Sequence, residues 1–178
     1  EQRLEALELS DRAIANQPED PAAHHSRGVV LERLRRARDA AESFREAWRV
    51  SGSSMPVALS DLALALHKSG SQYREALEAM SEFSALQPLD ASQLLTLINL
   101  RLHFCEWDTL GQDVGVLREA IVRGESAGKL APALAVSVPG LGEEEMHRVS
   151  TDFASDVVDA TVLERASERP RAAARHGQ

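Results

Sequence analysis

The residue types that carry most enzyme chemistry are sparse in this chain. Its single cysteine, Cys105, has no second thiol with which to form a disulfide or a zinc site. The six histidines include no His-Glu-x-x-His motif and no pair spaced four residues apart, so a metal site is not expected. Gly140 and Gly142 are followed by three glutamates, which would repel a phosphate. We therefore expect no catalytic residue, no metal and no cofactor within this chain.

Two further side chains could take part in chemistry or binding: Cys105 as a nucleophile and Trp107 as a platform on which a ligand stacks. Cys105 lies on the apolar side of an expected helix and has no base fixed beside it, so we interpret it as a buried packing residue. Trp107 is interpreted as an aromatic side chain that covers apolar helix ends. Both residues are thus assigned a structural role.

The composition favours a single helical domain. The chain has 178 residues, of which 43% are hydrophobic and only 4% aromatic, and its abundant Ala and Leu lose little entropy in a helix. A formal net charge of −8 argues against nucleic acid or an anionic membrane as a partner. No apolar run approaches the roughly 20 residues of a membrane span. The single cysteine fits a reducing compartment, so we expect a cytoplasmic protein.

A repeat of 34 residues organises the first half of the sequence. Shifting the chain by 34 positions places Ala6 on Ala40 and Ala13 on Ala47. This period is the period of tetratricopeptide (TPR) repeats, each of which is a helical hairpin.

The small residues of the repeat have a mechanical purpose. Gly28 and Ala40 would let the two helices of a hairpin approach closely, while Phe44 would fill the gap to the next hairpin, with Ala47 behind it. A third copy repeats this pattern of small and large apolar residues and ends in a proline. Its motif residues are Ala63, Ala76, Met80, Phe83 and Pro88.

Helix boundaries can be read from local signals. Asp20 followed by Pro21 is typical of a helix start, and Asp90 with Gln93 resembles a capping box. The first expected helix would be the second half of a hairpin whose first half is absent. We expect helices over 2–16, 21–34, 38–51, 56–69, 73–86, 91–105, 109–123 and 143–164.

These elements predict an all-α, right-handed TPR-type superhelix closed by a C-terminal docking helix. Residues 1–90 would form the TPR repeats, 91–124 a divergent hairpin, 125–165 a linker and the docking helix, and 166–178 a flexible tail. The docking helix has apolar residues at spacings of three and four, which suits packing on the solenoid. They are Met146, Val149, Phe153, Val157 and Ala160.

The first helix of each TPR hairpin lines a concave groove, where such solenoids usually bind extended peptides. We therefore predict a module that binds extended peptide or protein segments through polar and small side chains. The candidate groove residues are His25, Ser26, Val29, Arg33, Ser60, Asp61, Leu64, Lys68, Thr96, Asn99 and His103.

The segment after the repeats supplies a more specific resemblance. Cys105-Glu106-Trp107, a Pro-containing apolar stretch and a long helix resemble the segment that joins TPRs to the catalytic lobes of SPINDLY-like protein O-GlcNAc transferases, where Cys-Asp-Trp stands at this point. With the repeats, the resemblance covers about residues 1–165. It implies a parent enzyme in which the TPRs present Ser/Thr protein substrates to lobes that use UDP-GlcNAc and follow Gln178.

Two departures limit this resemblance. The Asn ladder of the family's groove is replaced by Ser26 and Asp61. The chain also contains no Gly-Tyr-x-Ser-x-Asp stretch of the catalytic half, so no catalytic residue can be transferred. A free-standing TPR adaptor, or an N-terminal module of another TPR-fused enzyme, remains the alternative.

Overall fold

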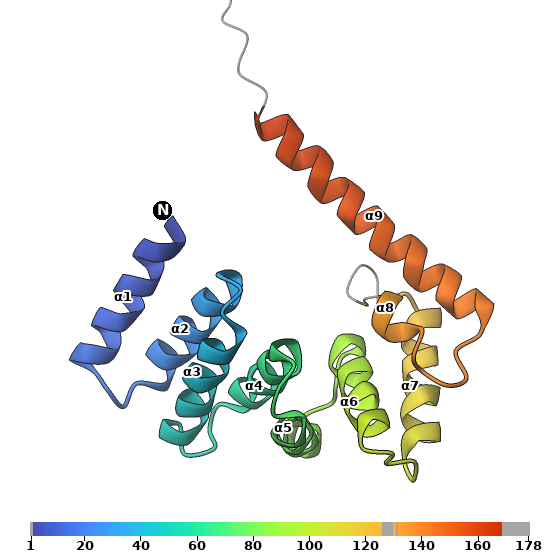
Figure 1. Cartoon of the computed structure of the whole chain (residues 1–178), viewed down its shortest axis with the longest axis horizontal. Helices are drawn as coiled ribbons and strands as arrows, with labels where there is room; N and C mark the ends of the chain where they lie inside the picture. The colour runs from blue at the N-terminus through green and yellow to red at the C-terminus, as the bar shows by residue number, and fades with distance from the viewer. Residues whose placement is uncertain (1, 126–129, 131, 169–178) are drawn as a thin grey trace, which may run out of the picture.

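A row of helices, each packed on the next, forms the body of the molecule (Figure 1). The computed structural model describes residues 2–125, 130 and 132–168, and these residues contain no β-strand. The fold is an all-α helical solenoid. Its helices are α1 (Gln2–Asn16), α2 (Pro21–Arg33), α3 (Ala37–Val50), α4 (Pro56–Ser69), α5 (Tyr73–Leu86), α6 (Ala91–His103), α7 (Leu110–Val122), α8 (Pro132–Ala135) and α9 (Glu143–Glu168).

Local capping signals place several helix starts where the sequence predicts them. The Asp20 side chain accepts a hydrogen bond of 2.9 Å from the backbone N–H of Ala22, and Pro21 occupies the first helical position. Asp90 and Gln93 form the reciprocal bonds of a capping box, at 2.8 and 2.9 Å. Because nearby side chains bond the free backbone N–H groups of the first turn, the starts of α2 and α6 can be predicted from the sequence. The short α8, inside the Pro/Ala/Val stretch, was not expected.

Two helices end through a left-handed residue that is not glycine. After α2, Arg35 adopts φ 62°, and the next N–H, that of Arg36, bonds the carbonyl of Leu31 at 2.9 Å. After α6, Cys105 adopts φ 56° and the N–H of Glu106 bonds the carbonyl of Arg101 at 2.9 Å. This is the Schellman termination, in which glycine is usual because a side chain costs roughly 1–2 kcal/mol there. It ends α6 at His103, two residues before the expected end.

The first hydrophobic core lies among α2 to α6 and depends on close helix approach. A Cβ added to Gly28 would lie only 2.5 Å from the Phe44 ring. Phe44, Ala40 and Ala47 are completely buried, and Ala63 and Ala76 also have no exposed surface. Small residues therefore admit the ring between the helices, as the repeat pattern predicts.

The second core lies among α6 to α9, so α6 takes part in both cores. Leu97 and Leu100 face the first core, whereas Leu94, Leu95 and Ile98 face the second. The boundary expected at residue 90 coincides with the start of α6. The two cores nevertheless meet on opposite sides of one helix, without a linker between them.

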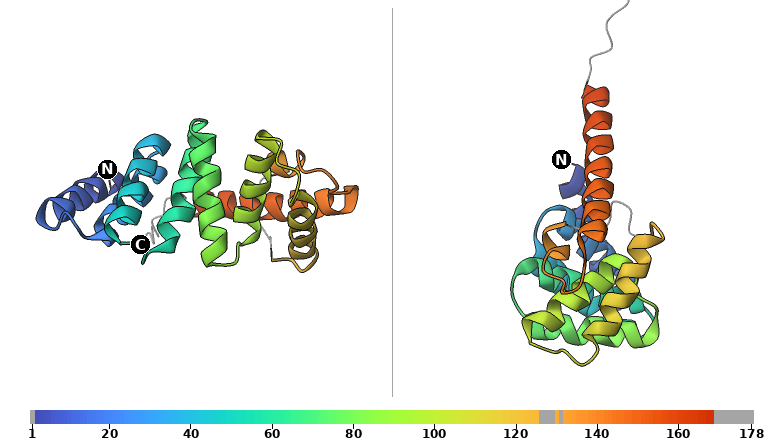
Figure 2. Two further views of the ribbon diagram at one scale, coloured as in Figure 1. Left: turned by 90° about the horizontal axis from the view of Figure 1, so that it is seen from below. Right: turned by 90° about the vertical axis from the view of Figure 1, so that its right-hand side faces the viewer.

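Among the described side chains of α9, those near its beginning pack on the second core. Met146 packs on the second core and Val149 is buried, but Phe153 is already 38% exposed. Beyond this point the helix projects away from the row (Figures 1 and 2). The side chains of Val157 and Ala160 lie outside the described residues, as do positions 169–178 of the expected tail. The helix itself runs to Glu168, four residues beyond its expected end at Glu164.

Within the described residues, none of the helices combines the length and apolarity needed to cross a bilayer.

Candidate functional site

Alternate helices share one face of the solenoid, and the predicted groove residues lie along it. His25 of α2 contacts Asp61 of α4 through Nε2 and Oδ2 at 2.8 Å. Farther along the same two helices, Lys68 donates to Glu32 at 2.5 Å. Both pairs join residues 36 positions apart, close to the repeat length. The first helices of neighbouring hairpins are thus side by side, with polar bonds between them.

The bonds continue from α4 to α6, which contact each other directly. The side-chain amide of Gln93 donates to the hydroxyl of Ser60 at 2.7 Å. Ser60 is only 1% exposed and Thr96 only 4%, and the Thr96 hydroxyl donates to the carbonyl of Ser92. These two predicted groove residues are therefore buried, because α4 and α6 approach too closely to leave a solvated surface between them.

The other candidate residues remain accessible to different degrees. Ser26, Arg33, Lys68 and His103 are exposed, while His25, Val29, Asp61, Leu64 and Asn99 are half-buried. Asn99 donates to the carbonyl of Leu95 at 2.8 Å and accepts from the Ser137 hydroxyl at 2.6 Å. The imidazole of His103 lies 4.5 Å from the Tyr73 ring. Ser26 and Arg33 thus offer the side chains least committed to packing.

Burial perturbs two titratable groups along α4. It raises the pKa of the Asp61 carboxyl, although the hydrogen bond from His25 acts in the opposite direction. It lowers the pKa of His67, and the positive charges of Lys68 and His103 lower it further. Desolvation is the largest cause of both shifts, and we attribute both to packing between hairpins.

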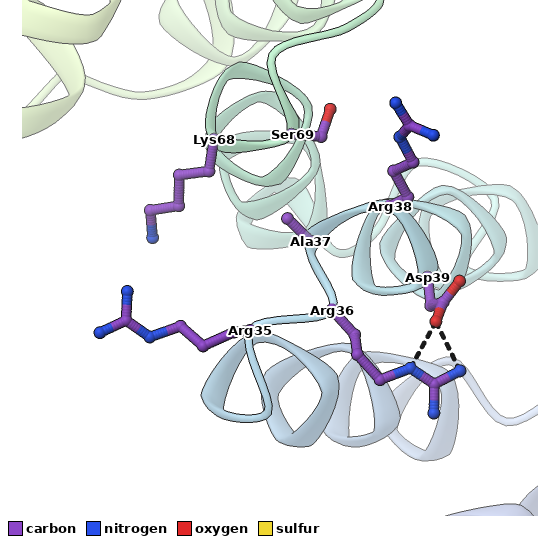
Figure 3. A pocket seen from close by; sticks show the side chains of 7 residues that line it. All are labelled: Arg35, Arg36, Ala37, Arg38, Asp39, Lys68 and Ser69. Atoms are coloured by element: carbon purple, nitrogen blue, oxygen red, sulfur yellow. Dashed lines mark hydrogen bonds and ion pairs between the residues drawn. The ribbon is translucent and has the colours of Figure 1, made fainter.

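The hollows of this face lie at one end, around the α2–α3 turn. One pocket of about 460 Å³ is lined by Arg35, Arg36, Ala37, Arg38, Asp39, Lys68 and Ser69 (Figure 3). A second, of about 540 Å³, shares Arg35, Ala37 and Lys68 with it and adds Glu32 and Arg33. Of the predicted groove residues, Arg33 and Lys68 line these hollows.

The sequence prediction included Arg33 but not Arg35, Arg36 or Arg38. Four of the six residues from Arg33 to Arg38 are arginine, in a chain whose net charge is −8. That local excess of positive charge was the available signal. The expected groove was defined by the first helix of each hairpin, and Arg35, Arg36 and Arg38 follow α2, outside that helix.

The Cys-Glu-Trp segment is exposed, contrary to the interpretation of its cysteine and tryptophan. Cys105 is the left-handed residue of the turn after α6, which points its thiol to solvent. Trp107 is 57% exposed and therefore does not cover helix ends. Glu106 accepts from Arg74 at 3.1 Å, and the Arg74 guanidinium lies 3.8 Å from the centre of the Phe104 ring. The turn is held by Glu106 and Phe104 instead.

Comparisons with known proteins leave the family open. No protein-family model matches the chain, and no curated protein is significantly similar to it. The TPR assignment and the resemblance to SPINDLY-like transferases therefore stay predictions from the sequence. In the part of the chain that the structure describes, no three His, Cys, Asp or Glu side chains gather where they could hold a metal ion.

Proposed function

We propose that this chain is a protein-interaction module that binds an extended peptide or protein segment along the face of α2, α4 and α6. The observation that carries the proposal is the set of bonds between alternate helices. His25–Asp61, Lys68–Glu32 and Gln93–Ser60 align three helices into one surface of polar and small side chains. Such a surface can bond the backbone of an extended segment without requiring one sequence.

Fewer residues of this face could contact a bound peptide than the sequence predicts. Ser60 and Thr96 are buried between helices, and Asp61 is engaged with His25. Surface for contact is retained by Ser26, Val29 and Arg33 of α2, by Leu64 of α4, and by Asn99 and His103 of α6.

The test uses a displayed library of random peptides selected on the purified chain. Binding of the selected peptides is then measured by fluorescence anisotropy with the wild-type protein and with Ser26→Arg. Ser26 is exposed, and a large charged side chain there should obstruct the face without disturbing the core. We expect affinity to fall by about tenfold or more, which corresponds to about 1.4 kcal/mol.

Ala85→Arg is the matched control, because Ala85 is exposed on α5, which does not belong to this face. It adds the same side chain and should leave affinity unchanged. Equal affinity of both variants and the wild type would place the peptides elsewhere and refute the proposed face. Failure of every selected peptide to bind more tightly than about 1 mM would also refute it.

A further inference from the structure

Basic side chains gather at the turn between α2 and α3, and some of them form no ion pair with a neighbouring carboxylate in the described part of the chain. We call the two hollows that share Arg35, Ala37 and Lys68 together the basic pocket; Arg38 and Asp39 line the first hollow, and Arg33 and Glu32 line the second. Arg36 is paired with Asp39 and Lys68 with Glu32. In the described part of the chain, the side chains of Arg33, Arg35 and Arg38 have no ion-pair partner. The positive charge of the pocket is therefore carried by arginines that are available to a ligand.

Both walls of the basic pocket direct basic groups to the same side. In Figure 3 the guanidinium of Arg35 and the ammonium of Lys68 extend from opposite walls toward one opening, while Arg36 turns to Asp39 and Arg38 points away from that opening. Helix α3 begins at Ala37 on the floor between them, and no side chain caps its N-terminus. Uncapped N–H groups and the positive end of the helix dipole add to the attraction for an anion.

The backbone of Arg35 makes its side chain easy to remove in an experiment. Arg35 holds the left-handed position that ends α2, with φ 62°. The corresponding position after α7 is Gly124, with φ 74°. Glycine would occupy the Arg35 position without strain, so replacing the arginine with glycine should not destabilise the fold.

We propose that the basic pocket binds a phosphomonoester dianion, such as the phosphoserine side chain of a protein partner, with Arg35 as its principal ligand. Arginine matches phosphate oxygens with paired N–H groups, and a dianion balances the arginines left without partners. A long polyanion fits less well, because a chain of net charge −8 would repel nucleic acid or an anionic membrane outside this small region. Glu32 lies in the wall but is held by Lys68 at 2.5 Å.

This site adjoins the proposed peptide-binding face and shares Arg33 with it, but Arg35 belongs to the pocket alone, so variants of Arg35 test the pocket separately. The probe is a fluorescein-labelled Gly/Ser peptide that carries one phosphoserine, compared with the same peptide carrying serine. At low ionic strength we expect the full chain to bind the phosphorylated peptide about tenfold more tightly or better, as read by anisotropy. Inorganic phosphate should compete with it.

Arg35→Gly is the decisive variant, since it removes the guanidinium and relieves the left-handed strain. The midpoint of thermal unfolding should stay equal or rise, while binding of the phosphorylated peptide falls about tenfold. Arg12→Gln is the control: Arg12 is also exposed and lies on α1, away from the pocket, so binding should persist.

Three results would overturn the proposal. They are equal binding of the two peptides, equal binding by wild type and Arg35→Gly, and Arg35-dependent binding of phosphatidylserine vesicles without binding of the phosphopeptide. The last result would assign the pocket to membranes. None of the three would alter the binding of peptides selected on the α2, α4 and α6 face, so the two proposals fail independently.

Discussion

The two cores of the solenoid reach close packing by different means. In the first core, six of the sixteen buried residues are alanine, and Phe44 and Phe83 are placed among them. In the second, three of the thirteen buried residues that the structure describes are alanine and the rest are branched aliphatic residues, with no aromatic ring among them. The first core therefore depends on a few large rings fitted against small residues, whereas the second spreads its packing over many medium-sized side chains.

Polar contacts differ between the cores in the same way. Around the first core, bonds such as His25–Asp61 and Arg45–Glu75 recur between neighbouring hairpins. At the second core, Arg101 and Asp113 form a well-shielded ion pair, with both side chains less than a fifth exposed. Repetition makes the contacts of the first region predictable from one another, while those of the second are particular to their site.

The largest expected effect comes from truncating a ring of the first core. Phe44→Ala should lower the free energy of unfolding by about 3–5 kcal/mol, because it empties a fully buried site between close helices. Urea unfolding followed by circular dichroism measures it. Phe153→Ala, on the exposed part of α9, should change stability by less than about 1 kcal/mol. Comparable losses in the two variants would contradict this view of the first core.

The same substitution should have opposite signs in the two regions. Gly28→Ala places a Cβ 2.5 Å from Phe44, and overpacking of about 1–3 kcal/mol should exceed the gain of about 1 kcal/mol in helix propensity. Gly115 lies within α7, where an added Cβ meets nothing within 4 Å. Gly115→Ala should therefore stabilise by about 1 kcal/mol. Thermal unfolding of both variants checks the comparison, and stabilisation by Gly28→Ala would refute close approach at this position.

The smallest expected effect is a dependence of stability on pH at the α4–α5–α6 junction. The pKa of His67 is lowered by burial and by the charges of Lys68 and His103, so the folded state favours the neutral imidazole. Its stabilising contribution is present above the ordinary value of 6.5 and is lost as the pH falls through the folded-state pKa. The unfolding midpoint of wild type should thus decrease on acidification below about pH 6.5.

His67→Gln should reduce this decrease while leaving the midpoint above pH 6.5 less affected. His24→Gln, at a half-buried histidine on α2, is a control of the same chemistry. Identical pH profiles for wild type and His67→Gln would show that His67 does not produce the acid sensitivity.

The sequence by itself determined the helices, their order and the contact that organises the first core. The helix starts at Pro21 and Ala91 are set by caps a few residues away, and the Gly28–Phe44 contact is encoded by spacing within one repeat. Such features can be predicted because their causes lie nearby in the sequence or recur with the repeat. The end of α6 lacked such a signal, since Cys105 takes a conformation that residue type predicts only for glycine. The short α8 was not predicted either.

Tertiary structure alone decided which polar residues are buried and which are available. Ser60 and Thr96 are residue types common on surfaces, but both are buried because α4 and α6 pack closely. The basic pocket brings Arg35 beside Lys68 from different helices, and the docking of α9 stops between Val149 and Phe153 within one amphipathic pattern. Each outcome depends on the distance between helices that are remote in sequence, which periodicity along one chain does not contain.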